Sequence, residues 1–381
     1  MKKGITLLTL VVSLFFGLEV MQAQSGLKKA NNEYENLAYS ESIKIYQEVA
    51  NKGFVNSELV KKLGDSFYFN GDYTSAFKWY TKLFTDFDSD DIEAVYAFRF
   101  AQTLKNVEEY DSAQVYLNRY AKQIQNNLQR QMVQLNLDSE IDQNSGRYII
   151  KRLEINSPYS DYPNSVHDDK LYFTSARDTG NFTKRVFTWT GDAFTKLYTS
   201  SINEDGALGG PIKLSSKIDS KFNESGSVLT NDGNTLYFTR NNFLDGKRGI
   251  NDKKITLLKI YRAELKDGKW TNVTELPFNS DQFSTAHPVL NVTEDVLYFV
   301  SDRPGGFGSS DIWKVKIIGT GFGKPENLGP MINTIGRESF PYVTVNNELY
   351  FSSDTRNGLG GLDVYVTKLK EDGSFTEVQN V

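Results

Sequence analysis

Acidic, basic and glycine residues gather in one segment of this 381-residue chain, where their spacing could support chemistry. Asp302 and Arg303 precede Gly305 and Gly306, and Asp311 follows the loop. Carboxylates around a glycine loop can bind Ca²⁺ through oxygen, but the dense aspartate spacing of an EF-hand is missing. The segment favours a structural pair instead, in which the aspartate accepts loop N–H groups and the arginine braces it. Calcium binding and catalysis are the less favoured alternatives.

A second copy of this segment places Asp354 and Asp363 around another glycine-rich loop. A motif that recurs within one chain is typical of a repeated structural unit and not of a single reactive centre. We therefore predict no catalytic, metal-binding or cofactor-binding residue. The aspartates, arginine and glycines named so far are expected to hold each unit together.

The composition disfavours most classes of enzyme. The chain has no cysteine, which excludes disulfides, thiolate catalysis and cysteine zinc sites. Its two histidines, His167 and His287, occupy different positions in the repeat described below, so each is expected at the surface or at a strand end. The Gly-x-Ser-x-Gly turn of serine hydrolases is absent. A net charge of −5 argues against nucleic acid as a partner.

The elements that must position these residues repeat along the second half of the chain. Leu-Tyr-Phe occurs four times, with separations of 65, 61 and 52 residues between its leucines at 171, 236, 297 and 349. A turn signal precedes each copy, and a second apolar run ending in a bulky aromatic residue follows it. Strand, tight turn and strand at this period predict the blades of a β-propeller.

A shorter element precedes each blade, and we call it the lead-in loop. It carries a leucine followed within a few residues by Asn or Asp and then Ser or Thr, whose side chains can fix the start of the innermost strand. The four pairs are Asn156-Ser157, Asp219-Ser220, Asn279-Ser280 and Asn333-Thr334.

The first half of the chain has a different period. Small residues recur in pairs twelve positions apart, which lets two helices of a hairpin approach closely. The pairs are Ala30 and Ser42, Gly64 and Ala76, and Ala101 and Ala113. We predict three helical hairpins over residues 27–125, with Asp72 and Asp111 near the start of a second helix. An ordinary helical bundle is the alternative.

Both repeats resemble known ones. The helical spacing resembles the tetratricopeptide repeat. The third strand repeat resembles the PD40 (WD40-like) blade motif through Ser301-Asp302-Arg303, Gly305-Gly306 and Asp311-Ile312-Trp313. The first two blades depart from that motif at Ser175-Ala176-Arg177 and Thr239-Arg240-Asn241. The resemblance implies an α plus all-β multidomain protein, in which a tetratricopeptide-type helical solenoid precedes an incomplete β-propeller of PD40 blades.

The first residues read as a secretory signal. Lys2 and Lys3 precede the apolar run Ile5–Leu18, which is too short to span a bilayer, and Ala23 is the predicted residue before cleavage. No other stretch has the apolar length of a membrane span, so we expect no transmembrane segment after signal removal. The predicted organisation is a signal at 1–23, helical repeats at 27–125, a closing helix or linker at 126–147, and a propeller at 148–381.

This order of segments resembles the front part of OmpA-family envelope proteins of the Bacteroidota, PorE-like and associated with type IX secretion and gliding. Val378–Val381 lines up with Pro325–Leu328, the run before the fourth blade, so we expect the sequence to stop where a fifth blade begins. The resemblance implies a periplasmic protein, peripheral to the outer membrane, that reaches peptidoglycan only through a C-terminal domain not present here.

The expected function is a non-catalytic exported scaffold that binds envelope proteins, either outer-membrane or secretion-system components, without a cofactor. The alternative is a carbohydrate-binding or hydrolytic propeller whose helices serve as an oligomerisation module. Its binding site would lie in the longer loops at 178–195 and 241–257, which are basic. Their basic residues, with the arginine just before the first loop, are Arg177, Lys184, Arg185, Lys247 and Arg248.

Overall fold

The computed structural model describes residues 21–88, 91–123, 146, 148–178, 186–214, 216–370 and 372–381. The chain divides into two compact units. One is a helical unit, Met1–Gln123 with Phe187–Gly191, and the other is a sheet unit, Ile124–Val186 with Asp192–Val381. Residues 1–20 of the predicted signal and all of the predicted linker at 126–147 except Gly146 lie outside the described residues.

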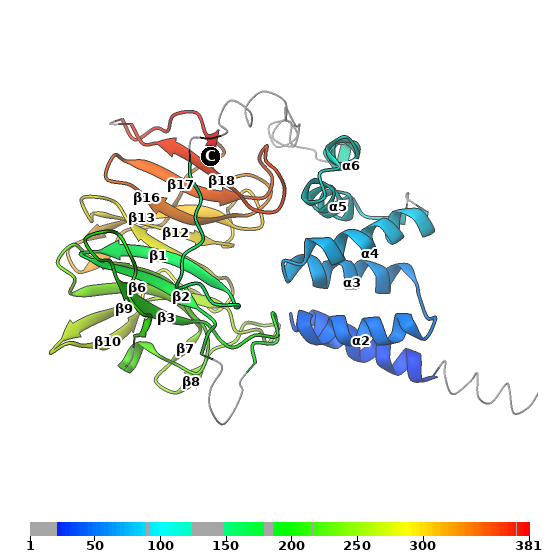
Figure 1. Ribbon diagram of the computed structural model, residues 1–381, viewed down its shortest axis with the longest axis horizontal. Helices are drawn as coiled ribbons and strands as arrows, with labels where there is room; N and C mark the ends of the chain where they lie inside the picture. Colours follow the sequence, from blue (N-terminus) through cyan, green and yellow to red (C-terminus); the bar gives the residue numbers. More distant parts are fainter. Residues whose placement is uncertain are drawn as a thin grey trace, which may run out of the picture. The chain divides into compact units, whose positions relative to one another are not determined.

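The described residues of the helical unit form six helices in three successive pairs (Figure 1). The first helix covers residues 21–35 and includes Ala23, the residue before the predicted cleavage point. The helices that follow are α2 (Tyr39–Asn51), α3 (Ser57–Phe69), α4 (Tyr73–Asp86), α5 (Ala94–Asn106) and α6 (Tyr110–Gln123). Among α2 to α6, each helix is in contact with the next along the chain.

The small residues at the predicted twelve-residue spacing are all buried where helices meet. A methyl group added to Gly64 would lie 2.7 Å from the ring of Tyr80, so a larger residue there would push the two helices apart. At the turn before α4, the carboxylate of Asp72 accepts the N–H of Ser75 at 2.9 Å and caps the helix. Asp111 lies two residues further in, within the first turn of α6.

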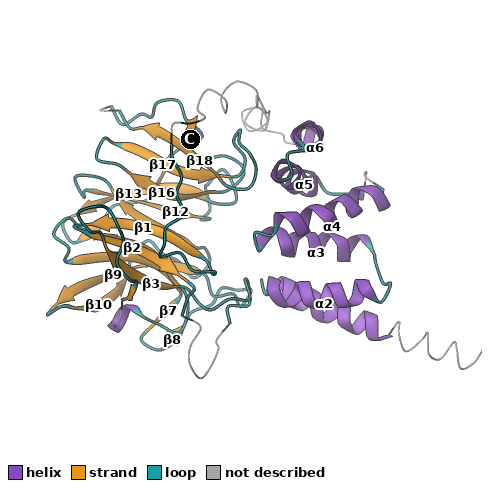
Figure 2. Cartoon of the chain, viewed as in Figure 1, coloured by secondary structure: helices purple, strands orange, loops and turns teal. Residues whose placement is uncertain are grey.

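The described residues of the sheet unit form four antiparallel sheets in chain order, which we call blades 1 to 4, and one small hairpin (Figure 2). Each copy of Leu-Tyr-Phe lies in the second strand of a blade, as predicted. Blade 1 contains β1 (Asp161–His167), β2 (Lys170–Ser175), β3 (Lys196–Ser201) and β4 (Ile212–Lys213). Blade 2 contains β5 (Glu224–Leu229), β6 (Thr235–Asn241), β9 (Leu258–Lys266) and β10 (Lys269–Glu275), and the small hairpin β7 (Phe243–Leu244) and β8 (Lys247–Arg248) lies between β6 and β9.

Blades 3 and 4 repeat the same strand order. Blade 3 contains β11 (Thr285–Leu290), β12 (Val296–Ser301), β13 (Asp311–Ile318), β14 (Gly321–Phe322) and β15 (Glu326–Asn327). Blade 4 contains β16 (Glu338–Val343), β17 (Glu348–Ser353), β18 (Asp363–Lys368) and β19 (Gln379–Asn380). The innermost strands β1, β5, β11 and β16 contact one another in that order, which is the arrangement of a propeller.

The two faces of each blade carry different residues, because side chains alternate along a strand. In blade 3 one face carries Val289, Tyr298 and Ile312, and we call the corresponding side of every blade its forward face. The opposite, rear face carries the leucine and phenylalanine of Leu-Tyr-Phe and the aromatic residue of the third strand.

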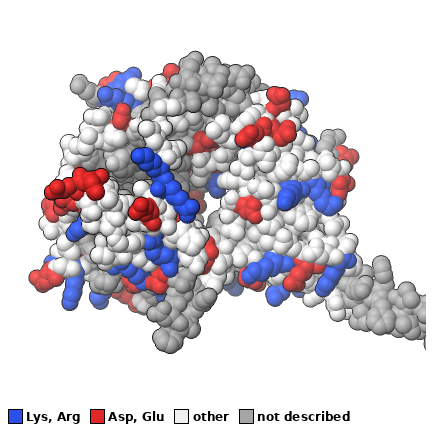
Figure 3. Space-filling model, in the orientation of Figure 1, with Lys and Arg blue, Asp and Glu red and all other residues white. Residues whose placement is uncertain are grey.

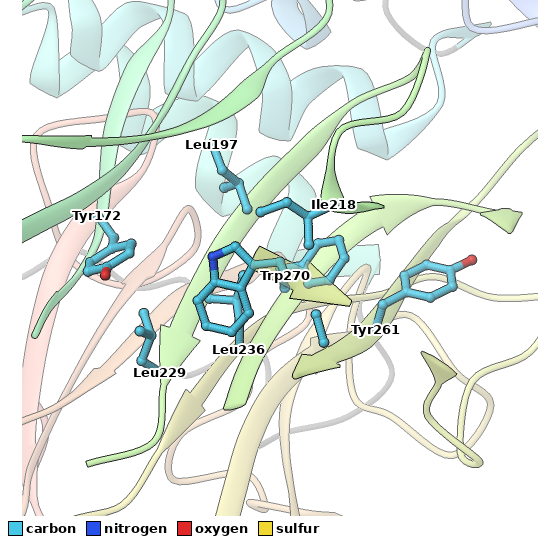
Figure 4. Close-up of a cluster of buried hydrophobic side chains, with 9 residues drawn as sticks. Tyr172, Leu197, Ile218, Leu229, Leu236, Tyr261 and Trp270 are labelled. Carbon is cyan, nitrogen blue, oxygen red and sulfur yellow. The ribbon is translucent and has the colours of Figure 1, made fainter. Parts of the chain in front are cut away.

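The hydrophobic core lies between blades, where the forward face of one meets the rear face of the next. Tyr172 and Leu197 of blade 1 pack against Leu236 and Tyr261 of blade 2 (Figure 4). Two similar clusters lie between blades 2 and 3 and between blades 3 and 4. Each of these three clusters, in the described part of the sheet unit, joins two neighbouring blades, so each blade depends on its neighbours for burial.

The last residues of the chain form the fourth strand of blade 4. Asn380 pairs with Tyr365 in β18, just as Asn327 pairs with Trp313 in β13. The N–H of Val381 donates to Val364 at 2.9 Å, as that of Leu328 donates to the corresponding residue of blade 3. This register agrees with the predicted alignment of residues 378–381 with 325–328.

One short segment from between β2 and β3 belongs to the helical unit. Within Phe187–Gly191, the indole N–H of Trp189 donates to the carbonyl of Phe69 at 3.0 Å. The ring of Trp189 meets that of Tyr39 edge-on at 4.9 Å, and the N–H of Ser40 donates to the Trp189 carbonyl at 3.2 Å. From the sequence these residues are predicted to belong to the propeller.

Candidate functional site

One arginine of each blade lies over the aromatic rings of the second and third strands. Each guanidinium carbon is within 6 Å of both ring centroids, which is the range of a cation–π contact. The four groups are Arg177 with Phe173 and Tyr198, Arg240 with Phe238 and Tyr261, Arg303 with Phe299 and Trp313, and Arg356 with Phe351 and Tyr365.

The same arginines hold the lead-in loops. Each one donates from a terminal nitrogen to the carbonyl of the apolar residue just before the Asn or Asp of the loop. The acceptors are Ile155 at 2.8 Å, Ile218 at 2.7 Å, Phe278 at 3.2 Å and Ile332 at 3.0 Å, in blade order. The recurring positive charge of the blades is therefore used to fix the start of each innermost strand.

The pair predicted for Asp302 and Arg303 differs from the observed arrangement. Asp302 accepts the N–H of Ser284 at 2.6 Å, so the aspartate does hold loop backbone. Arg303 donates to the Ser301 hydroxyl and the Phe278 carbonyl, and its charge also attracts the neighbouring Asp302 carboxylate. Burial among the rings lowers the pKa of Arg303 to about 10, and the charge remains at neutral pH because that value is still well above 7.

Asp354 occupies the matching place in blade 4. Its carboxylate accepts the N–H of Arg337, the residue just before the innermost strand, at 2.7 Å, and pairs with the Nε of the same arginine at 2.8 Å. Blades 1, 2 and 4 each have an acid at the start of the innermost strand, and in blades 1 and 2 this acid forms an ion pair with the stacked arginine. These pairs are Asp161 with Arg177 at 3.0 Å and Glu224 with Arg240 at 3.2 Å.

The glycine loops are held by the aspartate at the start of the third strand. Asp311 accepts the N–H groups of Phe307 at 2.6 Å and Gly308 at 3.1 Å. A side chain on Gly306 would lie 2.6 Å from the carboxylate, and Gly305 has a φ of +91°, so both positions require glycine. In blade 4, Asp363 accepts the N–H of Gly360 at 3.1 Å.

These aspartates therefore bind N–H groups, which is the function the sequence analysis favoured for them. Within the described residues, no three His, Asp or Glu side chains lie together as a group that could hold a metal ion. Lysine replaces the third-strand aspartate in blades 1 and 2, where Lys196 pairs with Glu224 at 2.7 Å and Lys259 with Asp281 at 2.7 Å. The repeat motif thus varies in charge while the strand positions stay the same.

The prediction that both histidines lie at the surface or at strand ends is wrong for His287. His167 does end β1. His287 lies within β11, at a bulge where its φ is +54°, and its ring contacts Phe340 of β16 at 4.4 Å. Burial lowers the pKa of His287 to about 4, so the ring is neutral at pH 7. Phe340 in turn meets Tyr162 of blade 1 at 5.8 Å.

A buried polar cluster in the helical unit was not predicted. Asp65 of α3 accepts hydrogen bonds from the hydroxyls of Tyr34 at 2.8 Å and Tyr80 at 2.7 Å, and from Arg99 at 2.6 Å. Burial and the nearby carboxylate raise the pKa of both tyrosines, so they donate at any physiological pH. The four residues come from four helices and connect all three helix pairs.

The cluster is bordered by a surface of basic and aromatic residues, which we call the Lys61 face. Lys61, Lys62 and Arg99 each lie within 6 Å of a tyrosine ring, Tyr96 or Tyr34. The three cations come from α3 and α5, and the tyrosines from the first helix and α5, which are the first helices of their pairs. Lys61 also pairs with Glu93 at 2.5 Å, and Lys62 with Glu58 at 3.1 Å. Figure 3 shows acidic and basic side chains interspersed on the side in view, without one dominant basic patch.

The signal for Asp65 was present in the sequence. An aspartate directly after Gly64, on the side of a predicted helix that faces its hairpin partner, is a buried charge that needs a partner. Arg99 lies more than thirty residues away, and only the tertiary arrangement of the helical unit makes it that partner.

No protein-family model and no curated protein matches this sequence. Several solved structures match weakly. They include a xylan beta-1,4-xylosidase from Bacillus halodurans (18% identity, 57% of this chain and 43% of that chain, TM-score 0.35) and the tricorn protease (11% identity, 59% and 27%, TM-score 0.32). A protein of unknown function from Dyadobacter fermentans also matches (12% identity, 58% and 69%, TM-score 0.34). The matched part thus spans less than half of the xylosidase.

Proposed function

We propose that this chain is a non-catalytic scaffold that holds other proteins through its helical unit and its blades. The observation that carries the proposal is the use made of the recurring charged residues. The stacked arginine of every blade donates a hydrogen bond to a lead-in carbonyl, and the motif aspartates accept hydrogen bonds from loop N–H groups. Groups already paired in this way position backbone and are poor candidates for acid–base chemistry, which needs a group directed at a substrate.

The setting of the proposal comes from the resemblance of the repeats. Helical pairs with tetratricopeptide spacing before PD40-type blades support an exported protein of the PorE-like OmpA-family group, located in the periplasm and peripheral to the outer membrane. The partners would be outer-membrane or secretion-system proteins, and contact with peptidoglycan would require a further C-terminal domain. Among the residues that the structure describes, no helix has the length and apolarity needed to cross a membrane.

The Lys61 face is the partner surface that we favour on the helical unit. Its lysines and tyrosines are partly exposed and come from the first helices of the pairs, which line the concave side in solenoids of this type. A partner segment bearing acidic and aromatic residues would exchange the intramolecular pairs Lys61–Glu93 and Lys62–Glu58 for intermolecular ones.

Crosslinking in the cell envelope, followed by purification of the chain, tests this proposal. We expect one outer-membrane or secretion-system protein to be recovered with the unaltered chain and with Val115→Glu, an exposed change on α6. A double charge reversal, Lys61→Glu with Lys62→Glu, should abolish the recovery. Equal recovery from all three would refute the assignment of this face, and recovery of no envelope protein from any would refute the scaffold.

A panel of glycoside and peptide substrates tests the absence of catalysis. We expect no turnover above that of the buffer. Sustained hydrolysis of one substrate class would replace the scaffold with the hydrolytic alternative. The basic residues of β8, Lys247 and Arg248, are exposed and would then be the first positions to change.

A further inference from the structure

The start of α2 lacks a cap from its own sequence. The residue before it is Ala38, whose side chain cannot accept a backbone N–H, whereas the residues before α3 and α4 each accept one with their side chains. The N–H of Ser40, in the first turn of α2, has no carbonyl within the helix to receive it. It donates at 3.2 Å to the carbonyls of both Thr188 and Trp189. A distant segment of the chain therefore completes the first turn of α2.

The same segment completes the end of α3. The last four carbonyls of a helix have no partner within it. In α3, the first three of these carbonyls accept N–H groups from the residues that follow directly, 70–72. The fourth, that of Phe69, accepts the indole N–H of Trp189 at 3.0 Å. Trp189 therefore supplies an acceptor to one helix and a donor to the other.

Aromatic rings line the place where these two helix ends meet. The ring of Tyr39 is buried and stacks on that of Phe69, with centroids 5.3 Å apart. The ring of Trp189 meets Tyr39 edge-on at 4.9 Å, and the ring of Phe187 stacks on that of Trp189 at 6.4 Å. Stacked and edge-on ring pairs add a directional attraction to the burial of apolar surface. The site therefore recognises an indole both by its ring and by its N–H.

The segment that fills the site is Phe187–Gly191, which we call the Trp189 strap. It is a closed turn, in which the N–H of Gly191 donates to the carbonyl of Phe187 at 2.8 Å. The flanking residues Val186 and Ala193 form an antiparallel bridge. Gly191 has a φ of +83°, which glycine adopts without strain. Because the turn is held by its own bonds, it presents the indole and the backbone carbonyls in a fixed arrangement.

Blade 1 does not depend on the strap for its sheet. The strands on either side of the strap in the sequence, β2 and β3, pair directly with each other from Lys170 with Ser201 to Ser175 with Lys196. The strands of blade 1 are β1 to β4, and none of them includes a strap residue. A segment outside the sheets can leave its site at the cost of its own contacts. The strap is therefore a displaceable occupant.

We propose that the ring of Tyr39, the N–H of Ser40 and the carbonyl of Phe69 form a docking site for a tryptophan-bearing turn of a partner protein, which the Trp189 strap closes. The partner's indole N–H donates to the Phe69 carbonyl, and its backbone carbonyls accept the Ser40 N–H. The strap selects this occupant, because its chemistry satisfies each of these groups at once. The inference rests on the scaffold function proposed above, and it adds a regulated partner site to the Lys61 face.

Peptide binding to the full chain, measured by fluorescence anisotropy, tests the site. The probe is a labelled head-to-tail cyclic peptide with the sequence of residues 186–193, whose two ends are already paired in the structure. We expect Trp189→Ala to bind this probe about tenfold or more tightly than the unaltered chain, because an intact strap competes for the same groups. Trp79→Ala removes a partly exposed tryptophan of α4 and should bind like the unaltered chain. A probe with alanine in place of tryptophan should bind none of the chains.

A disulfide can hold the strap closed. A β carbon on Gly191 would lie 3.3 Å from that of Ser40, close to the roughly 3.5–4.5 Å found in disulfides. The chain has no cysteine, so Ser40→Cys with Gly191→Cys can form only this bond. We expect the oxidised chain to exclude the probe. The same chain reduced with dithiothreitol should bind the probe at least as tightly as the unaltered chain, since a cysteine at a φ of +83° strains the strap.

Three results would overturn the proposal. The first is equal affinity of Trp189→Ala and the unaltered chain for the probe, or no binding to either. The second is equal binding by the oxidised and reduced cysteine variant, which also decides the matter if circular dichroism shows that Trp189→Ala is unfolded. The third is a dimer of the unaltered chain that Trp189→Ala dissociates in gel filtration, which would make a second copy the occupant. Each of these results would remove this site and leave the scaffold to the crosslinking test.

Discussion

The side-chain amide of Asn333 pairs with both the N–H and the carbonyl of Ile312, at 2.8 and 2.9 Å, across the junction between blades 3 and 4. Asn333 thereby makes the two hydrogen bonds that the backbone of a neighbouring strand would make. It links the lead-in loop of blade 4 to blade 3. From the sequence, this Asn-Thr pair is predicted to act within its own loop. Thr334 does so, because its N–H and hydroxyl both donate to Glu338.

Replacing Asn333 with alanine should destabilise the sheet unit. The change leaves the buried N–H of Ile312 unsatisfied and its carbonyl with only the Leu328 N–H, which costs about 1–3 kcal/mol in the free energy of unfolding. Urea unfolding followed by tryptophan fluorescence measures the loss. Asn346→Ala, in an exposed turn, is the control and should change stability little. Similar unfolding midpoints for both variants would show that the inter-blade bonds contribute little.

Replacing Asp65 with asparagine should destabilise the helical unit. The change removes the negative charge that pairs with Arg99 at 2.6 Å and leaves the guanidinium in a largely buried place. Loss of one partner from a buried ion pair costs about 3–5 kcal/mol. Urea unfolding followed by circular dichroism at the helix band reports on this unit. Asp91→Asn, on an exposed residue, is the control, and an equally stable Asp65→Asn chain would contradict a structural role for the cluster.

Arg303→Lys should weaken blade 3 although it keeps the positive charge. A lysine cannot lie flat between Phe299 and Trp313 while it donates to both Ser301 and the Phe278 carbonyl. We expect a loss of about 1–2 kcal/mol in the free energy of unfolding. Arg248→Lys, at an exposed position in β8, should have no measurable effect. Equal stability of the two variants would mean that charge alone matters at position 303.

The stability of the sheet unit should depend on pH through Glu338. Burial raises the pKa of Glu338 to about 7 from its ordinary value of 4.5, even though Thr334 and Ser353 donate to it and Arg356 lies near. The native state therefore holds a proton that the unfolded chain releases between these two values. Stability is greatest at the acid end of this window and falls by roughly 3 kcal/mol as the pH rises to about 7.

Glu338→Gln removes this titration and should flatten the pH dependence. The free energy of unfolding of both chains, measured at pH 5 and pH 7.5, gives the comparison. Glu326→Gln, on an exposed strand of blade 3, should keep the slope of the unaltered chain. If the slope persists in Glu338→Gln, another group is responsible for it.

Much of the fold could be predicted because it is periodic. The position of each blade in the sequence could be predicted, since strand alternation is visible in the residue order. The signals were the four copies of Leu-Tyr-Phe, the aromatic residues that follow them, and the alignment of residues 378–381 with 325–328. The positions of the helix pairs could be predicted in the same way, from Gly64 and Ala76 and the other small residues at twelve-residue spacing. The place of His287 could not be predicted, because its bulge depends on how β11 meets β12 and β16.

Residue order alone determined the strand and helix periods of this protein, the glycines that the loops require, and the aspartates that hold those loops, because each depends on neighbours a few positions away. Tertiary structure decided which distant groups became partners. It paired Asp65 with Arg99, gave each stacked arginine a lead-in carbonyl as a partner, and left Val364 exposed where Ile312 is buried. Those outcomes follow from the packing of one repeat against the next, which local sequence does not encode.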